Sequence, residues 1–332
     1  MSPRSALMLP KAHLHAHLIP SARRETFLEL AQRYGVDVSD AWQFSNLSEF
    51  IGRSVLSFEV IQTPDDLARV CREFVEDEAS QGVRYTEPMI GVGFFARQLG
   101  MSREAVFDLQ DLAFRAASAE TGVEVGYMLG MLRHQPLDEI EALARFAAER
   151  ADRGVVALGL AGDEDVGSFA SFGRAFDIAR EAGLLVVPHA GESRGPESVR
   201  EALDTARPHR LAHGVRAVED PDLLRRLADE QIPCDVCLTS NVKLGVVDDV
   251  VAHQLPELLA AGVPVTLNAD DQLFFGPKVG EEYELARAAL GLSDVELAEI
   301  ARTSARVSGA SAATRARILD GIDGWLADPP AQ

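Results

Sequence analysis

The feature that most constrains the fold of this chain is a repeated alternation of short apolar segments with longer amphipathic ones. The short segments are typical of buried parallel strands, and the longer ones carry Ala, Leu, Glu and Arg at helical spacing. Eight strands in such an alternation predict a closed parallel (β/α)₈ barrel, the TIM-barrel class of α/β folds. The predicted strands are 11–18, 83–90, 123–132, 155–161, 184–189, 210–214, 232–238 and 263–268.

A doubly wound open sheet is the alternative arrangement of the same elements. That fold commonly carries a G-x-G-x-x-G turn after its first strand, and the sequence has no such turn there. The length of 332 residues also suits one barrel with insertions. We therefore predict a single barrel domain over residues 1–332.

Amphipathic segments between the strands predict helices, several of which begin at a capping residue such as Thr63 or Ser102. The longest connection, residues 19–62, carries helical patterns and several aromatic residues. It is either a lid over the catalytic end of the barrel or an insertion that fills surface grooves. The predicted helices are 64–81, 102–120, 136–153, 196–206, 220–230 and 255–261, with additional terminal helices over 293–328.

The composition limits the partners and the location of the protein. A formal net charge of −20 repels phosphate backbones and anionic lipids, so we expect neither a nucleic acid nor a membrane partner. Three cysteines and an N-terminus without a long apolar segment predict a cytoplasmic protein. The partner expected instead is a small-molecule substrate, and the oligomeric state stays open.

Three histidines on the first predicted strand, His13, His15 and His17, lie at alternate positions and therefore share one face. Each buried imidazole needs partners for its nitrogens, so packing alone does not explain three of them. Active-site residues of a barrel gather at the carboxyl ends of its strands. We therefore favour His15 and His17, the pair nearer that end, as metal ligands. His13 is predicted to be a hydrogen-bonded core residue.

Further polar residues follow the ends of other predicted strands. His189 and Glu192 come at the end of the fifth strand, His213 ends the sixth, and Asp270 and Asp271 follow the eighth. Imidazoles and carboxylates that meet at one rim match the mixed nitrogen and oxygen ligands of zinc. A carboxyl beside a metal and an apolar wall, as expected for Glu192, can serve as a general acid.

Other residues carry weaker signals. Gly162 follows the fourth strand, where it either lets a ligand approach the backbone or forms a plain turn. Cys234 and Cys237 form a C-x-x-C motif, but no second cysteine pair exists, and we predict that both are small core residues. The remaining histidines are predicted to lie on the surface: His134, His209 and His253.

Six segments together resemble the adenosine deaminase family of the amidohydrolase superfamily. They occur in the family's order, their spacing covers nearly the whole chain, and their combination is more specific than any one of them. The segments are L-P-K-A-H-L-H-A-H-L at 9–18, A-G-D-E at 161–164, H-A-G-E at 189–192, H-G at 213–214, C-L-T-S-N at 237–241 and N-A-D-D at 268–271.

The resemblance implies that zinc is bound by His15, His17, His189 and Asp270. Dinuclear members of the superfamily commonly bridge two metals with a lysine on the fourth strand. Residues 155–164 contain no lysine, so we expect one zinc ion per subunit.

The resemblance also implies hydrolytic deamination of a 6-aminopurine nucleoside or a related substrate, with release of ammonia. Glu192 is then the proton donor to the ring, and His213 orients or deprotonates the attacking water. Asp270 is counted with these two residues as catalytic. The residues expected to contact the substrate are Gly162, Asp271 and His17.

The chain departs from the family pattern just after the second ligand histidine. The family usually has an acidic residue and a glycine there, and this chain has Ile19 and Pro20. The acidic residue looks toward the ribose 5′-hydroxyl, and isoleucine cannot accept that hydrogen bond. We therefore expect a substrate that is altered or apolar near that end. Relatives that look like aminodeoxyfutalosine deaminases also lack the acid, and their substrate carries an aromatic extension on the 5′ side.

Two alternatives belong to other functional classes. The first is a mononuclear amidohydrolase that acts on a non-nucleoside amino-heterocycle or amidine, which Ile19 and Pro20 leave open. The second is an inactive barrel used for binding, which is disfavoured because none of the expected ligands or acids is missing. Bound divalent metal and release of ammonia separate these classes.

Overall fold

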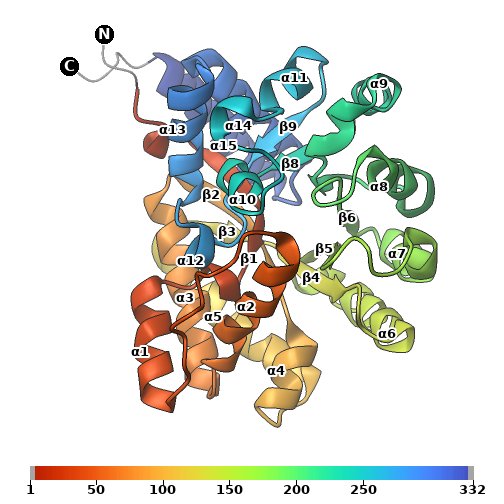
Figure 1. The fold of residues 1–332 in the computed structure, drawn as a ribbon. Coiled ribbons are helices and arrows are strands. Elements are labelled where there is room, and N and C mark those ends of the chain that lie inside the picture. Colours follow the sequence, from red (N-terminus) through yellow and green to blue (C-terminus); the bar gives the residue numbers. More distant parts are fainter. Residues whose placement is uncertain (1–3, 328–332) are drawn as a thin grey trace.

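The computed structural model describes residues 4–327, and its centre is a nearly closed barrel of parallel strands surrounded by helices (Figure 1). Neighbouring strands follow the order β1-β2-β4-β5-β6-β7-β8-β9, with β3 paired to β2. The predicted (β/α)₈ barrel is confirmed. The strands are β1 (Lys11–His17), β2 (Val83–Ile90), β3 (Glu124–Val125), β4 (Tyr127–Leu132), β5 (Val155–Ala161), β6 (Leu185–Ala190), β7 (Leu211–His213), β8 (Cys234–Val236) and β9 (Val265–Leu267).

The barrel closes where β1 meets the segment that follows β9. Ala16 forms a parallel bridge with Asp270, whose backbone N–H donates to the His15 carbonyl at 3.1 Å. The side chain of Asn268 completes the closure, because its Oδ1 accepts the backbone N–H groups of Leu14 at 2.8 Å and His15 at 3.1 Å. One amide side chain thus replaces part of a strand-to-strand ladder.

His13 supports the same closure from inside the barrel. It is fully buried, its Nδ1 lies 2.9 Å from Glu78 Oε2, and its Nε2 accepts the backbone N–H of Ala269 at 3.1 Å. Both ring nitrogens therefore have protein partners. The prediction that His13 is a hydrogen-bonded core residue is confirmed.

The predicted strand 123–132 is the one strand that the structure divides. Gly126 separates β3 from β4, and a Cβ atom at this position would lie 2.3 Å from the Tyr85 hydroxyl. Only glycine allows such a close approach between the two segments.

Helices cover the outside of the barrel, and the predicted caps at Thr63 and Ser102 accept backbone N–H groups of the turns that follow them, as Asp220 does for a third helix. The helices over 92–98, 173–181, 238–243, 272–275 and 279–290 were not predicted from the sequence. The helices are α1 (Arg24–Tyr34), α2 (Leu47–Glu59), α3 (Pro64–Ser80), α4 (Val92–Gln98), α5 (Arg103–Thr121), α6 (Leu137–Ala148), α7 (Gly173–Glu181), α8 (Pro196–Glu201), α9 (Pro221–Asp229), α10 (Leu238–Lys243), α11 (Leu255–Ala260), α12 (Gln272–Phe275), α13 (Val279–Leu290), α14 (Asp294–Val307) and α15 (Ala312–Ala327).

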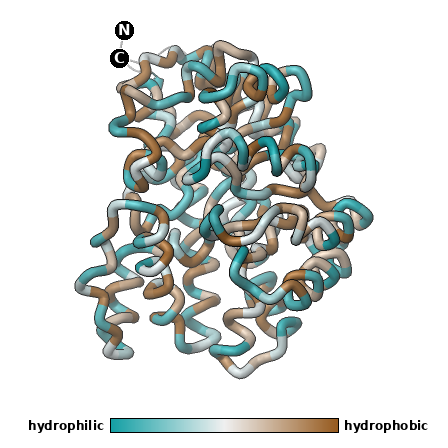
Figure 2. Tube along the Cα trace, turned by 45° about the vertical axis from the view of Figure 1, so that its right-hand side comes forward, coloured by the Kyte–Doolittle hydropathy of each residue, from teal (hydrophilic) through white to brown (hydrophobic). Residues whose placement is uncertain are grey.

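The terminal helices end, within the described residues, at Ala327, and the predicted helical residue 328 lies outside them. Along the outer helices, hydrophobic and hydrophilic positions alternate, as expected for helices with one buried face (Figure 2). One apolar cluster joins residues from Ala6 to Trp325. The assignment of residues 1–332 to a single domain stays a prediction.

The insertion at 19–62 contains α1 and α2, and aromatic contacts fix it to α12. The Phe50 ring lies 5.5 Å from the Phe274 ring and 4.9 Å from the Phe275 ring, between centroids. The indole N–H of Trp42 donates to the Leu273 carbonyl at 3.0 Å. The insertion is therefore packed on the segment that directly follows Asp271.

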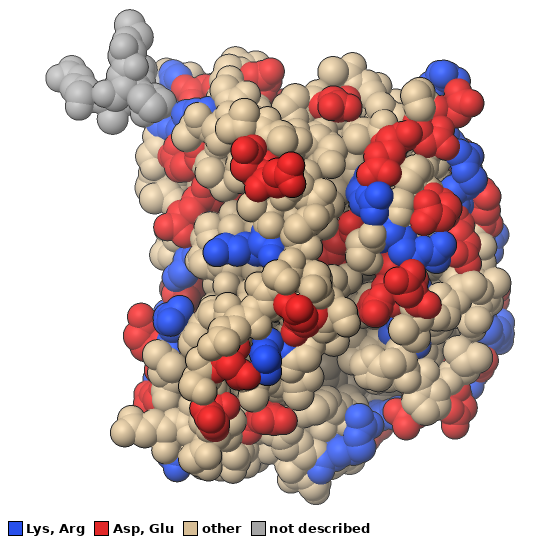
Figure 3. Space-filling model, viewed as in Figure 1, with Lys and Arg blue, Asp and Glu red and all other residues tan. Residues whose placement is uncertain are grey.

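Among residues 4–327, no helix has the length and apolar character needed to cross a membrane. Acidic and basic side chains are interspersed over the face shown in Figure 3, so no continuous basic patch forms on that face.

Replacing Asn268 tests the closure of the barrel. Asn268→Ala leaves two buried N–H groups of β1 without an acceptor, so the free energy of unfolding should fall by at least about 2 kcal/mol in urea denaturation. Gln43→Ala is the matched control, because Gln43 is exposed and no hydrogen bond of its side chain is seen within residues 4–327. Equal stability of the two variants would show that Asn268 does not hold the barrel closed.

Candidate active site

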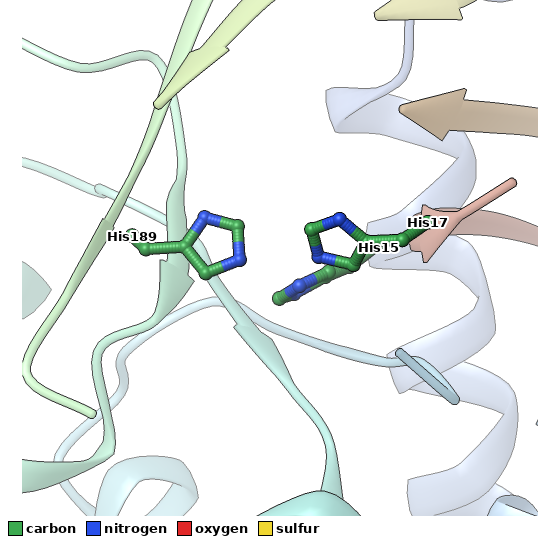
Figure 4. Close-up of side chains that lie close together, drawn as sticks. All are labelled: His15, His17 and His189. Atoms are coloured by element: carbon green, nitrogen blue, oxygen red, sulfur yellow. The ribbon is translucent and has the colours of Figure 1, made fainter. Parts of the chain in front are cut away.

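Three imidazoles from two strands converge at the carboxyl end of the barrel. His15 and His17 lie on β1 and His189 on β6, and their rings point toward one another (Figure 4). Ring centroids of His15 and His17 are 5.5 Å apart, and that of His189 is 4.8 Å from His15 and 5.3 Å from His17. One nitrogen of each ring lies within 4.8 Å of the others, close enough for all three to share one ion.

Asp270 brings a carboxylate to the same point, because the barrel closure places it beside β1. Its Oδ1 lies 3.4 Å from His15 Nε2 and 3.3 Å from His17 Nε2, while Ser240 donates to its Oδ2 at 2.7 Å. Although burial opposes ionisation, the two imidazoles hold the pKa of Asp270 well below its usual range. The backbone of Asp270 has a φ of 58°, a strained value for a residue with a side chain.

The buried atoms of this cluster fit a metal ion. His15 Nε2 and Asp270 Oδ1 have no hydrogen-bond partner among the described residues, which is costly for buried polar atoms. The Nδ1 atom of His189 lies 2.9 Å from the Leu160 carbonyl, so this nitrogen carries the proton and the Nε2 lone pair is free. Nitrogen and oxygen donors with free lone pairs around one point suit a divalent transition metal.

Glu192 and His213 lie beside these groups. His213 Nε2 is 3.4 Å from Glu192 Oε1 and 3.9 Å from Asp270 Oδ2. Burial raises the pKa of Glu192 well above its usual value, and the nearby carboxylates of Asp270 and Glu164 raise it further. Burial likewise lowers the pKa of His213 to about 3, so this imidazole is neutral.

Glu164, to which the sequence analysis gave no role, positions the segment that carries Glu192. Its fully buried carboxylate accepts the backbone N–H groups of Gly191 at 3.1 Å, Glu192 at 2.8 Å and Ser193 at 3.1 Å, and the Ser198 hydroxyl. The A-G-D-E segment contains this residue, but the sequence alone does not show that its last carboxylate faces a different strand end.

A cavity of about 380 Å³ connects this cluster to the outside. Its inner end holds the predicted site residues, including Asp271 and Gly162, whose φ of 104° requires glycine. Its outer wall is mostly apolar, with residues from α2, α4 and the start of the insertion, including Ile19 and Pro20. The charged side chains of Arg97, Arg103 and Glu139 also line it. The predicted site residues that line it are His17, Gly162, His189, Glu192, His213, Asp270 and Asp271, and His15 lies behind them.

One prediction about an individual residue is wrong. His253 is buried rather than on the surface, and its Nε2 lies 3.1 Å from Asn241 Oδ1. Cys237 is a buried core residue, as predicted, but it lies directly before α10 rather than within a strand, and its Sγ lies 3.6 Å from His15 Nδ1. The C-L-T-S-N segment at 237–241 contained the only sequence signal for these contacts. His134 and His209 are exposed, as predicted.

Imidazoles and a carboxylate at the carboxyl ends of strands in a parallel barrel define a metal-dependent hydrolase of the amidohydrolase type. A family model described as adenosine deaminase matches residues 10–325. The chain belongs to the adenosine deaminase family, whose enzymes hydrolyse C–N bonds of aminopurines, and the resemblance drawn from the sequence is confirmed.

Relatives and solved structures agree with this assignment over nearly the full chain. A putative adenosine/adenine deaminase of Streptomyces virginiae is 44% identical and covers 97% of this chain and 98% of the relative. An adenine deaminase of Mesorhizobium japonicum is 38% identical, with 95% and 98% covered. The crystal structure of adenine deaminase from Arthrobacter aurescens superimposes with a TM-score of 0.88 at 32% identity, with 96% and 99% covered.

Removing one acceptor atom of Glu164 should loosen the Glu192 segment. In the wild type, each Glu164 carboxylate oxygen accepts at least one backbone N–H group. Glu164→Gln replaces one of these oxygens with an amide NH₂, which cannot accept, so at least one hydrogen bond is lost. Amide hydrogen exchange of residues 191–193 should speed up at least about tenfold. Asp165→Asn, an exposed change on the same loop, is the control. Unchanged exchange in Glu164→Gln would show that the carboxylate does not hold the segment.

Proposed function

We propose that this protein deaminates a 6-aminopurine hydrolytically, with one zinc ion per subunit, and that the natural substrate carries an apolar group on its sugar side. The observation that carries the proposal is the cavity, which joins the histidine and carboxylate cluster to an apolar outer wall. A cytoplasmic location remains part of the same proposal.

The ligands proposed for zinc are His15, His17, His189 and Asp270. When bound there, zinc supplies the Lewis acid that makes water a nucleophile at neutral pH. Borderline-soft zinc suits this set of imidazole and carboxylate ligands. β5 contributes no lysine that could bridge a second ion, which supports a single metal.

The residues of the chain then act on the purine ring. Glu192, a buried carboxyl at the inner end of the cavity, holds the proton that it gives to the ring nitrogen next to the amino-bearing carbon. This protonation makes the carbon more electrophilic, and ammonia leaves after the attack of water. Asp271 accepts a hydrogen bond from the ring edge, and the absence of a side chain at Gly162 leaves room for the ring against the backbone.

The apolar wall argues for the substituent on the sugar side. Ile19 lines the cavity at the position where the family pattern has an acidic residue, so no carboxylate there can accept a hydrogen bond from a ribose hydroxyl. Phe50, Ile51, Val55 and Phe58 of α2 extend the apolar wall outward. A ring that contacts Glu192 and Asp271 occupies only the inner end, and the part of the cavity along α2 is suited to an apolar group.

Adenine itself is a second candidate substrate. The relatives from Mesorhizobium japonicum and Arthrobacter aurescens are named adenine deaminases, and both match nearly the whole chain. A free base also needs no acceptor for a ribose hydroxyl, which agrees with Ile19.

Glu192→Gln tests the assignment of the proton donor. The variant keeps the shape of the side chain but has no acidic proton, so kcat should fall at least about a hundredfold. Metal content by plasma mass spectrometry should stay at one zinc per subunit, because Glu192 is not a proposed ligand. The exposed Glu197→Gln on α8 is the control and should retain full activity. Near-normal turnover by Glu192→Gln on the true substrate would refute the assignment.

A panel of adenine, adenosine and 5′-alkylthio- or arylthio-adenosines, followed by loss of purine absorbance, tests the substrate. Two methylene groups of the 5′ substituent, buried against the apolar wall, contribute about 1.6 kcal/mol. The kcat/KM for the 5′-substituted adenosines should therefore exceed the kcat/KM for adenosine roughly tenfold. Ile19→Asp should shift the preference back toward adenosine. Adenosine as the best substrate of the wild type would overturn the proposed role of Ile19, and adenine as the best would establish the second candidate.

A further inference from the structure

A chain of hydrogen bonds runs from the backbone near α11 to His213, through two residues that the reaction scheme above does not use. The backbone N–H of Leu255 donates to His253 Nδ1 at 3.0 Å. His253 Nε2 lies 3.1 Å from Asn241 Oδ1, and Asn241 Nδ2 lies 3.4 Å from His213 Nδ1. His253 and Asn241 are both buried, so water does not compete for these contacts.

The donor and acceptor of each hydrogen bond in this series are set by the backbone N–H of Leu255. A backbone N–H can only donate, so His253 Nδ1 is the acceptor. Burial lowers the pKa of His253 to about 4, which leaves the ring neutral with its single proton on Nε2. That proton is donated to Asn241 Oδ1, and the amide NH₂ of Asn241 therefore faces His213.

These hydrogen bonds determine which ring nitrogen of His213 carries the proton. Its Nδ1 accepts from Asn241, so the proton of the neutral ring is on Nε2. His213 Nε2 is buried and has no hydrogen-bond partner among residues 4–327, and it faces Glu192 and Asp270. His189 has the opposite tautomer, since its Nδ1 donates to the Leu160 carbonyl. The protein thus gives two neighbouring histidines opposite proton positions.

We infer that Asn241 and His253 are positioning residues that fix His213 as a hydrogen-bond donor at Nε2. This inference rests on the proposed deamination for its catalytic consequence. A ring that already carries a proton on Nε2 does not accept the proton of the attacking water at that atom. His213 therefore orients the attacking oxygen by donating to it, and the carboxylate of Asp270 is the acceptor on the other side. The same proton on Nε2 excludes this atom of His213 as a metal ligand.

The proton positions can be measured directly by two-bond ¹H–¹⁵N NMR on protein labelled with ¹⁵N-histidine. In the wild type, His213 should show a protonated Nε2 and an unprotonated Nδ1, both without metal and with zinc. Its signals are assigned by their loss in His213→Gln. A proton on Nδ1 of His213 in the wild type would overturn the inference.

Asn241→Asp is the sharpest variant, because a carboxylate can only accept. His213 should then carry its proton on Nδ1, and kcat should fall at least about tenfold while KM changes less than about threefold. Bound zinc, measured in parallel, should not change. A His213 tautomer that stays as in the wild type would contradict the proposed control by Asn241.

A pair of variants at His253 separates positioning from packing. His253→Leu fills the space but cannot donate a hydrogen bond to Asn241, so kcat should fall. His253→Gln can still donate through its side-chain amide, so it should keep most of the wild-type kcat. Equal kcat in both variants would refute the role of His253. The NMR measurement does not depend on any substrate. Failure to deaminate aminopurines would therefore refute the proposed function, while the measured tautomer of His213 would still test the inference about Asn241 and His253.

Discussion

The structure depends on the contact that closes the barrel between β1 and the segment after β9. Asn268 and His13 replace part of the ladder of backbone hydrogen bonds there, and they hold Asp270 against the carboxyl end of β1. His15 and His17 lie on that strand, so the closure places two imidazoles and one carboxylate together without a flexible loop. β6 then needs to bring only one more side chain, that of His189.

The site concentrates polar groups that a folded protein normally avoids burying. His15 Nε2, His213 Nε2 and Asp270 Oδ1 lack hydrogen-bond partners among the described residues, and Asp270 and His213 both have a positive φ. Such unpaired atoms and strained residues are destabilising unless a ligand or a metal completes them. Surrounding contacts compensate by fixing each group, as Glu164 does for the Glu192 segment and Ser240 for Asp270.

The apolar part of the cavity has a different origin. Much of it comes from the insertion after β1, whose helix α2 is held by ring contacts with α12, directly after the acidic pair that ends the barrel. The histidine and carboxylate cluster at the strand ends and the apolar wall along α2 therefore come from separate parts of the chain. Residues that line the cavity from the insertion can therefore differ without moving the histidines and the carboxylate at the strand ends.

The sequence by itself determined most strands and the capped helices, because periodicity and capping are local properties. It also identified the candidate site residues His15, His17, His189 and Asp270, because each lies on or just after a predicted strand and in a segment that resembles the family. It did not determine short helices such as α12, whose four residues are held by the aromatic contacts of the insertion. Only the tertiary structure assigned Glu164, Cys237, Asn241 and His253 to the site. Each of these residues looks ordinary among its sequence neighbours, and its role comes from a hydrogen bond to an atom or group that it can contact only after the barrel has closed.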